Sequence, residues 1–324
     1  MKSSGPDYSL SAPGAFSAGI RAGMQLTADL KSRSIVPQTI IQTGIWQLDY
    51  ALGGGLRTSE VSVIGASTGH GKSALAEQIA LYALTQVETT YFGLELGART
   101  TETRMVAKIM HTDKRTVDGL IHSCPDNEKL LNAVQCLTFE RKKLIVEQRD
   151  HDEEFFSTDM FKMMLANESK LYIIDHPRHL DDWHTNYLRE SREQAAARVV
   201  RKICSAAKYL NAHIIVVSQL KSALQKSRPI MQDLADTYAL AQSVDTVMLL
   251  HRPFRGKGWM DTVTEVILDK NRNGPEGITH VRWHGPHMKY SEMLPAEEAA
   301  LTCCKSRRKR KDVEAGTMAR WGDD

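Results

Sequence analysis

The stretch that decides the fold is Ala66-Ser67-Thr68-Gly69-His70-Gly71-Lys72-Ser73. The apolar, β-branched run that precedes it, from Glu60 to Gly65, predicts a short buried strand. The residues that follow, from Ala74 to Leu84, carry apolar side chains at helical spacing and predict a helix. A strand, a glycine-rich turn and a helix, joined through Gly-Lys-Ser, are the expected setting of a phosphate-binding loop. We therefore expect an α/β fold with a nucleotide site at this turn.

The residue types in this loop suit the phosphates of a nucleotide. Gly69 and Gly71 let the backbone curve closely around an anion, which the positive end of the following helix also faces. The Lys72 ammonium would reach the β- and γ-phosphates, and the Ser73 hydroxyl would coordinate Mg²⁺. The first position is Ala66 rather than glycine, which still leaves no bulk there. The sequence therefore predicts ATP and Mg²⁺ as cofactors.

Composition excludes several classes of protein. The 324 residues are 42% hydrophobic with a formal net charge of +3, which suits a globular core and does not by itself indicate nucleic-acid binding. The 5 cysteines form no Cys-x-x-Cys pair or His–Cys ligand set, so we expect neither a disulfide framework nor a zinc site. The sequence has no apolar run of about 18 residues and no signal-peptide layout, which predicts a cytoplasmic protein without a membrane span.

The chain divides into four predicted parts. Residues 1–14 are rich in Ser, Gly and Pro and predict a flexible N-terminus. Residues 15–40 predict a short linker helix or arm, which could pack on its own core or on a neighbouring subunit. Residues 41–293 hold the main domain. Residues 294–324 predict a basic, disordered tail, whose charge run at 305–311 fits either a solvated segment or a tether for DNA or an acidic partner.

Two further predicted strands bring a carboxylate to the edge where a ligand would bind. The strand predicted over residues 89–96 carries Glu95 near its end, and the strand over residues 171–175 ends in Asp175, a Walker B pattern. Glu95 could orient or deprotonate an attacking water, although a surface glutamate at a strand end fits the spacing equally well. Asp175 would hold Mg²⁺ directly or through water.

The second half of the main domain adds polar residues at predicted strand ends. A buried strand ends in Gln219, whose amide both donates and accepts and so suits a sensor of the γ-phosphate or its water. Two β-rich runs, 263–272 and 279–284, flank an Asn-Gly pair and predict a hairpin. Lys270 and Arg272 lie two apart and would project from one face of an extended strand. They fit either two solvated charges or cations that a second subunit offers to a phosphate.

Taken in order, five motifs resemble the RecA-like motor domain of DnaB-type replicative helicases over residues 40–290. They are Ala-x-x-x-x-Gly-Lys-Ser, Phe-x-Leu-Glu, Ile-Ile-Asp, Val-Val-Ser-Gln-Leu and Lys-Asn-Arg-Asn-Gly-Pro-x-Gly. The last motif, Lys270 to Gly277, is the most distinctive. The resemblance implies a RecA-like P-loop NTPase core with a mostly parallel central sheet, flanking helices and a C-terminal β-hairpin.

The resemblance also implies a role for each matching residue. Lys72 and the rest of the loop would bind nucleotide, with Ser73 and Asp175 at the metal. Glu95 would be the catalytic base, and Gln219 would link the nucleotide state to DNA loops. The cations that complete the neighbouring subunit's site would be Lys270 and Arg272. The DNA contacts would come from loops at about 177–189 and 221–239, with the candidates Arg178, Lys221, Lys226 and Arg228.

The function implied by the resemblance is that of an ATP-driven ring helicase, a hexamer in this family. Such a ring translocates on single-stranded DNA and unwinds duplex DNA during replication. A primase or a loader would be a partner, and the compartment would be the cytoplasm of a bacterium, or of a host if a phage or plasmid encodes the chain.

Three departures from the family pattern keep other functions open. Only residues 1–40 precede the motor, where the family has a helical collar domain. His176-Pro177-Arg178 replaces Tyr-Leu-Gln, and residues 233–242 lack Arg-Glu-Ser-Gly. The opening with Thr43-Gly44 and Gly53-Gly54-Gly55-Leu56 also resembles RadA- and KaiC-type ATPases. The alternatives are therefore a RadA-, KaiC- or recombinase-like DNA-dependent ATPase, and an ATP-gated assembly scaffold with slow hydrolysis.

Overall fold

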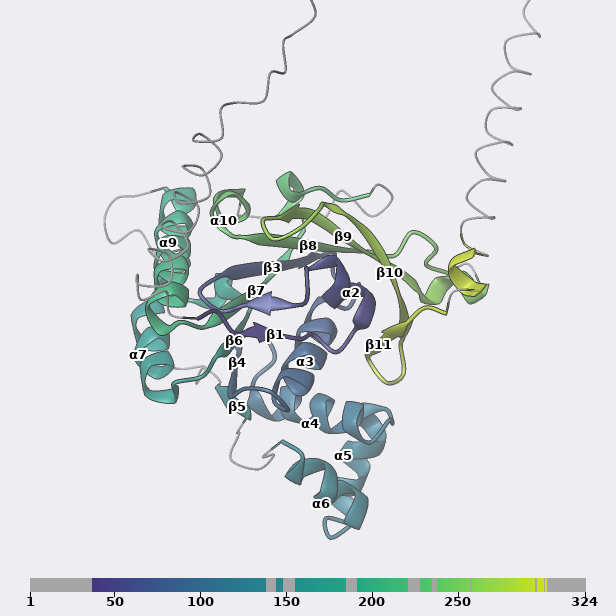
Figure 1. Cartoon of the computed structure of the whole chain (residues 1–324). Helices are drawn as coiled ribbons and strands as arrows, with labels where there is room; N and C mark the ends of the chain where they lie inside the picture. Colours follow the sequence, from purple (N-terminus) through teal and green to yellow (C-terminus); the bar gives the residue numbers. More distant parts are fainter. Residues whose placement is uncertain are drawn as a thin grey trace, which may run out of the picture. The chain divides into compact units, whose positions relative to one another are not determined.

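The structure is a computed structural model in which a nine-stranded sheet carries helices on both faces over the described residues (Figure 1). The described residues are 37–137, 144–147, 155–184, 191–220, 228–234, 238–256, 258–294, 296–299 and 301. The predicted segment 1–14, nearly all of the predicted arm 15–40 and the basic run 305–311 lie outside them. No described helix combines the length and the apolar content that crossing a bilayer requires.

The strands are β1 (Ile40–Ile41), β2 (Leu56–Arg57), β3 (Val61–Ala66), β4 (Thr89–Gly93), β5 (Leu144–Glu147), β6 (Leu171–Asp175), β7 (His213–Gln219), β8 (Thr246–His251), β9 (Val263–Asn271), β10 (Gly277–His284) and β11 (Lys289–Glu292). The helices are α2 (Trp46–Ala51), α3 (Lys72–Ala83), α4 (Ala98–Ile109), α5 (Lys114–Ser123), α6 (Glu128–Gln135), α7 (Ser157–Asn167), α8 (Asp181–His184), α9 (Arg192–Leu210) and α10 (Tyr238–Ser243). Short 3-10 turns are η1 (Pro177–His179), η3 (Met231–Asp233) and η4 (Gly258–Thr262).

The sheet is mostly parallel, as the sequence predicts. Its strand order is β11-β10-β9-β8-β3-β7-β6-β4-β5. The strands from β8 to β5 in that order run parallel, whereas β9, β10 and β11 extend the sheet in antiparallel fashion. The hairpin expected around Asn-Gly is confirmed as β9–β10, and β11 adds a third strand to it.

Alternating side chains of the central strands fill two separate cores, because successive residues of a strand face opposite sides of the sheet. In β7, Ile215 and Val217 join the core that α2, α3 and α4 cover. Their neighbours Ile214 and Val216 join the core that α7, α9 and α10 cover. Both faces of the sheet are therefore buried, which explains the nearly unbroken apolar runs of these strands.

One segment departs from its sequence pattern. Residues 113–169 have a mostly helical sequence pattern, and α5, α6 and α7 form helices over about half of the segment. The structure adds a strand, β5, which pairs in parallel with β4 at the edge of the sheet. Four residues in a strongly charged stretch carry too little periodicity for a strand to be recognised before its partner is known.

Strand register decides which residues can form one site. Ala66 pairs with Gln219, and Gly93 pairs with Asp175, so the loop after β3 and the ends of β4, β6 and β7 share one edge. At the other end of the sheet, Thr246 pairs with Asn271. The carboxyl edge of the parallel strands is where ligands bind in open α/β sheets.

Candidate nucleotide site

The loop of residues 66–73 forms the expected turn between a strand and a helix. β3 ends at Ala66, and α3 begins at Lys72. Gly69 and Gly71 have φ angles of 76° and 89°, a left-handed conformation that glycine adopts readily. The His70 backbone N–H donates to the Ser67 carbonyl at 3.1 Å, which closes the turn. The backbone thus has the curvature that a phosphate cradle needs.

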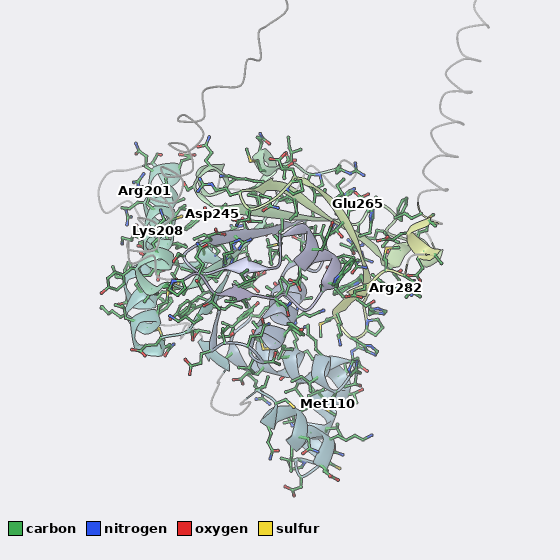
Figure 2. All side chains as sticks on the ribbon, viewed as in Figure 1. Met110, Arg201, Lys208, Asp245, Glu265 and Arg282 are labelled. Carbon is green, nitrogen blue, oxygen red and sulfur yellow. The ribbon has the colours of Figure 1, made fainter. Side chains whose placement is uncertain are left out.

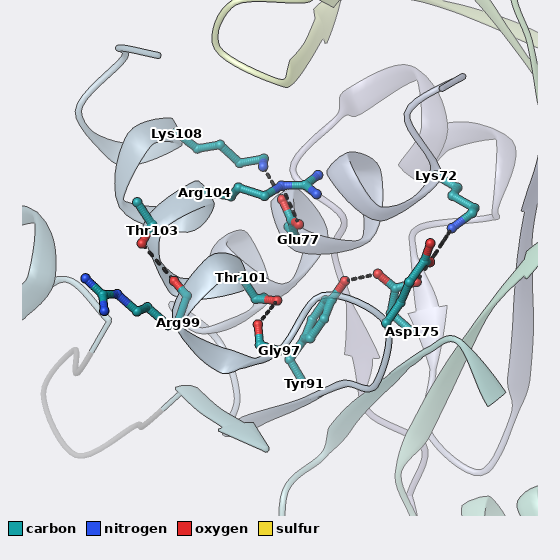
Figure 3. A network of polar contacts seen from close by, with 11 residues as sticks. Lys72, Glu77, Tyr91, Gly97, Arg99, Thr101, Thr103, Arg104, Lys108 and Asp175 are labelled. Carbon is teal, nitrogen blue, oxygen red and sulfur yellow. Dashed lines mark hydrogen bonds and ion pairs between the residues drawn. The ribbon is translucent and has the colours of Figure 1, made fainter. Parts of the chain in front are cut away.

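Lys72 joins the two predicted carboxylates. Its Nζ lies 3.0 Å from Glu95 Oε2 and 4.0 Å from Asp175 Oδ1 (Figure 3). The Asp175 side chain is 3% exposed, whereas that of Glu95 is 40% exposed. The Leu94 backbone N–H donates to the Asp175 carbonyl at 2.8 Å, which ties the end of β6 to the segment that carries Glu95. Glu95 therefore faces the loop lysine while remaining open to water.

Gln219 reaches the loop from the end of β7. Its Nε2 donates to Thr68 Oγ1 at 2.8 Å. The next residue, Leu220, forms an antiparallel bridge with Leu234, so the end of β7 lies beside the residue that follows η3. Gln219 thus contacts the phosphate loop directly before the position where a predicted DNA-binding segment begins in the sequence.

A cavity of about 290 Å³ lies over the loop. Five of its lining residues were missed by sequence reasoning. Ala74 and Leu96 adjoin predicted site residues in sequence, whereas Arg104 comes from α4, Trp283 from β10, and Met288 from the turn before β11. The Trp283 ring lies 4.9 Å from that of Tyr290, and the Arg252 guanidinium lies 5.8 Å from the Trp283 ring. Apolar and aromatic groups beside a phosphate cradle suit a nucleobase or sugar. The other lining residues are Thr68, Gly69, Gly71, Lys72, Ser73, Glu95 and Gln219.

A buried charge cluster supports the cavity wall. Glu77, fully buried on α3, is paired with Arg104, whose Nε lies 3.0 Å from Glu77 Oε1, and with Lys108 (Figure 3). Burial lowers the pKa of Lys108, and the Glu77 charge opposes that shift. A buried carboxylate requires such partners, so removing both cations would leave the Glu77 charge without compensation. The cluster joins α4, and with it Arg104, to the helix that follows the phosphate loop.

The histidines near the loop add no positive charge at neutral pH. Burial, together with Lys72, lowers the pKa of His176 to about 3. Burial, together with Arg255, lowers the pKa of His70 to about 4. Neutral imidazoles leave Lys72 and Arg104 as the cations that line the cavity in the described part of the chain.

Tyr91 contacts Asp175 from the neighbouring strand. Its side chain is 1% exposed, and its hydroxyl donates to Asp175 Oδ2 at 2.7 Å. Burial raises the pKa of Tyr91 well above its usual value of 10, and the charges of Asp175 and Glu77 raise it further. The hydroxyl therefore keeps its proton and remains a hydrogen-bond donor.

The close packing around Gly71 predicts that a single added methyl group lowers both stability and nucleotide affinity. A Cβ added there would collide with the Tyr290 hydroxyl, which donates to the His70 carbonyl at 2.9 Å. The left-handed φ adds strain of about 1–3 kcal/mol for a non-glycine residue. We expect Gly71→Ala to lower the melting temperature and to weaken nucleotide binding. Thermal unfolding and titration with a fluorescent ADP analogue measure both effects.

The matched control is Gly119→Ala. Gly119 lies inside α5, and a Cβ there meets no heavy atom of the described residues within 4 Å. Alanine favours a helix interior over glycine by roughly 0.5–1 kcal/mol. This variant should therefore keep or raise the melting temperature and bind nucleotide as the wild type does. Equal behaviour of the two variants would contradict the close packing of Tyr290 on the loop.

The structure does not bring Lys270 and Arg272 to the cavity of their own chain. Arg272 Nη1 lies 2.7 Å from Asp245 Oδ1, and its side chain is 58% exposed. Lys270 Nζ donates to the carbonyls of Ala241 and Gln242 at 3.0 and 2.8 Å. Strand register places this end of β9 about 13 Å along the sheet from the loop edge, at some 3.3 Å per residue over four residues.

The predicted DNA-contacting residues lie in different environments. Arg178 is exposed in η1, directly beyond the Walker B strand. Arg228 forms a two-pronged ion pair with the buried Glu265, at 3.0 Å from Nε and 2.9 Å from Nη2. Figure 2 shows Glu265 near the opposite end of the antiparallel strands from Asp245. Lys221 and Lys226 lie outside the described residues.

A family model of the DnaB-like helicase C-terminal domain matches residues 40–292. The replicative DNA helicase DnaB of Mycoplasma genitalium is 24% identical over 259 residues, which cover 73% of this chain and 53% of that protein. The DnaB of Helicobacter pylori is 22% identical over 321 residues, which cover 85% of this chain and 64% of that protein. The chain thus spans between half and two thirds of the length of these relatives.

Two solved structures share the fold. An ATPase domain superposes with a TM-score of 0.71 at 18% identity and covers 89% of this chain and 100% of that domain. A DnaB-like replicative helicase, whose structure was described together with its interactions with primase, superposes with a TM-score of 0.69 at 18% identity. It covers 84% of this chain and 66% of that chain. These likenesses confirm the RecA-like fold.

Proposed function

This chain belongs to the family of DnaB-like helicase C-terminal domains, and from that premise we propose that it is an ATP-driven ring helicase. It would translocate on single-stranded DNA and unwind duplex DNA during replication. The observation that carries the proposal is a divided site. Lys72, Glu95 and Asp175 meet at one edge of the sheet, whereas the exposed Arg272 lies at the other. A ring of identical subunits, a hexamer in our proposal, would join the two edges.

The residues at the cavity fit ATP with Mg²⁺. Asp175 Oδ1 is buried and has no hydrogen-bond partner in the described structure, which leaves it available to an ion or its bound water. Ser73 lines the cavity at the start of α3. Ser73 and Asp175 would hold the ion, which supplies positive charge to the β- and γ-phosphate oxygens. His70, Gly71 and the rest of the loop would hold the phosphates with backbone N–H groups.

The chain's own side chains would then complete the reaction. Lys72 would leave its ion pair with Glu95 for the phosphates, since a phosphate carries more negative charge than one carboxylate. Glu95, free of that partner and partly exposed, would accept the proton of the attacking water. Gln219 would sense the γ-phosphate through the loop that it already contacts at Thr68. Lys270 and Arg272 of one subunit would stabilise transition-state charge in the next.

Movement on DNA would follow from the link between Gln219 and the segment that begins after it. Through the bridge between Leu220 and Leu234, a shift at Gln219 would reach Leu234 as well as Leu220. Arg178 is exposed at the same edge and is available to a DNA phosphate. Lys221, Lys226 and Arg228 complete the proposed contacts, and Arg228 would have to exchange Glu265 for DNA.

A forked-duplex assay tests the proposed function. We expect DNA-stimulated ATP hydrolysis and ATP-dependent strand displacement, with DNA affinity that falls steeply as salt rises. Strand exchange or branch migration without displacement would favour a recombinase-like ATPase instead. Negligible turnover that DNA does not change would favour an assembly scaffold. We further propose a primase or a loader as partner, in the cytoplasm of a bacterium or of a phage or plasmid host.

A further inference from the structure

The carboxylate of Asp175 is held unequally at its two oxygens. Oδ2 accepts a hydrogen bond from the Tyr91 hydroxyl at 2.7 Å (Figure 3). Oδ1 has no hydrogen-bond partner among the described residues, and its nearest cation is Lys72 at 4.0 Å. Oδ2 is thus hydrogen-bonded within the sheet, whereas Oδ1 remains available on the side of the phosphate loop.

The position of Tyr91 follows from strand register. Tyr91 on β4 pairs with Ile173 on β6, and both side chains belong to the core under α3. Asp175 lies two residues beyond Ile173, so it faces the same side of the sheet. The ring of Tyr91 therefore packs in the core while its hydroxyl reaches the end of the next strand. A phenylalanine would fill the same space without the hydroxyl.

We propose that Tyr91 is a positioning residue for the magnesium ion, acting through Asp175. Its hydroxyl holds Oδ2 and so turns Oδ1 toward the ion or a water bound to it. The inference rests on the proposed function, because it requires a magnesium–nucleotide complex at Ser73 and Asp175. Partners that orient a metal ligand are worth about 10- to 100-fold in metal affinity when removed.

A purely structural role for the hydroxyl is the competing explanation, since a buried hydroxyl needs an acceptor wherever it lies. The neighbouring strand offers a matched control. Tyr172 on β6 is fully buried, and its hydroxyl donates to the Met164 carbonyl at 2.6 Å. It belongs to the core on the other face of the sheet, away from Asp175. Removing either hydroxyl takes one buried hydrogen bond from the same sheet.

The experiment compares Tyr91→Phe and Tyr172→Phe in the full chain. Binding of a fluorescent ADP analogue is titrated with Mg²⁺, and a titration in EDTA gives the metal-free affinity. For Tyr91→Phe we expect the half-saturating Mg²⁺ concentration to rise about tenfold or more. We expect the metal-free affinity to stay at the wild-type value. Tyr172→Phe should keep the wild-type Mg²⁺ dependence, and thermal unfolding verifies that both variants fold.

A double substitution keeps the test specific to Asp175. If Tyr91 acts through this carboxylate, adding Tyr91→Phe to Asp175→Asn should change ADP affinity no further, with or without Mg²⁺. A further loss would overturn the proposal, as would a Tyr91→Phe midpoint within about twofold of wild type or an equal shift in Tyr172→Phe. Wild-type protein that binds nucleotide without any Mg²⁺ dependence would instead refute the proposed function, and the positioning role with it.

Discussion

ATP hydrolysis is expected to fall by roughly a thousandfold or more in Arg272→Ala, because in our proposal Arg272 supplies positive charge to the γ-phosphoryl transition state of a neighbouring site. The register of β8 and β9 keeps Arg272 away from the loop of its own chain. Mixing this variant with Glu95→Gln should restore activity. Subunits with an intact Glu95 can then face subunits with an intact Arg272, at about one interface in four of a randomly mixed ring. Steady-state phosphate release measures both effects.

The control for this experiment is Arg115→Ala, which removes an exposed arginine from α5. It should hydrolyse ATP at the wild-type rate. Recovery of activity must also depend on total protein concentration, because it requires mixed assemblies. A mixture of Arg272→Ala and Glu95→Gln that stays as inactive as its parts would contradict the shared site. Full activity of the isolated monomer would contradict it as well.

The Glu95→Gln variant is expected to lose about 100- to 10,000-fold in the hydrolysis rate while it retains nucleotide binding. The amide keeps the shape of the side chain but cannot accept the proton of the attacking water. Its ion pair with Lys72 at 3.0 Å is lost, which frees the ammonium for the phosphates. Nucleotide affinity should therefore stay equal or rise. Single-turnover hydrolysis and binding of a fluorescent ATP analogue separate the two quantities.

The matched control is Asp118→Asn, which breaks another lysine–carboxylate pair on the protein. Lys114 Nζ lies 2.6 Å from Asp118 Oδ2 on α5, and both side chains are partly exposed. Such exposed pairs contribute about 0.3–0.5 kcal/mol at most, so neither rate nor affinity should change measurably. A Glu95→Gln variant that behaves like this control would mean that Glu95 is a surface glutamate at a strand end.

Much of the site could be predicted because its parts are short and contiguous in sequence. The loop of residues 66–73 combines a strand, glycines at left-handed positions and a helix start, and each leaves a local pattern. Glu95, Asp175 and Gln219 follow apolar strands, and parallel strands place such ends at one edge. Because ligands bind at that edge, the site can be located from these strand ends without knowledge of the strand order. The structure brings these side chains and Lys72 together as expected.

Residues that act through a partner far along the chain could not be predicted in this way. Tyr91 follows the apolar pattern of a core strand, and nothing local distinguishes a tyrosine whose hydroxyl meets a carboxylate 84 positions away. Arg228 presents itself in sequence as a free cation near a DNA-binding loop, yet it pairs with Glu265, 37 positions away. Arg104 has the spacing of an ordinary helix surface until Glu77 is found opposite it.

The contact between Tyr290 and the phosphate loop has a practical consequence for protein engineering. This residue lies on the last strand of the sheet, and its hydroxyl binds the carbonyl of His70 in the phosphate loop, 220 positions earlier. Gln78 on α3 adds two more bonds to the Tyr290 backbone. A shortened version intended only to bind nucleotide must therefore keep β11, although the phosphate loop itself ends at Ser73. Affinity tags and fusion partners attached beyond residue 301 leave the residues that form these hydrogen bonds of Tyr290 unaltered in the sequence.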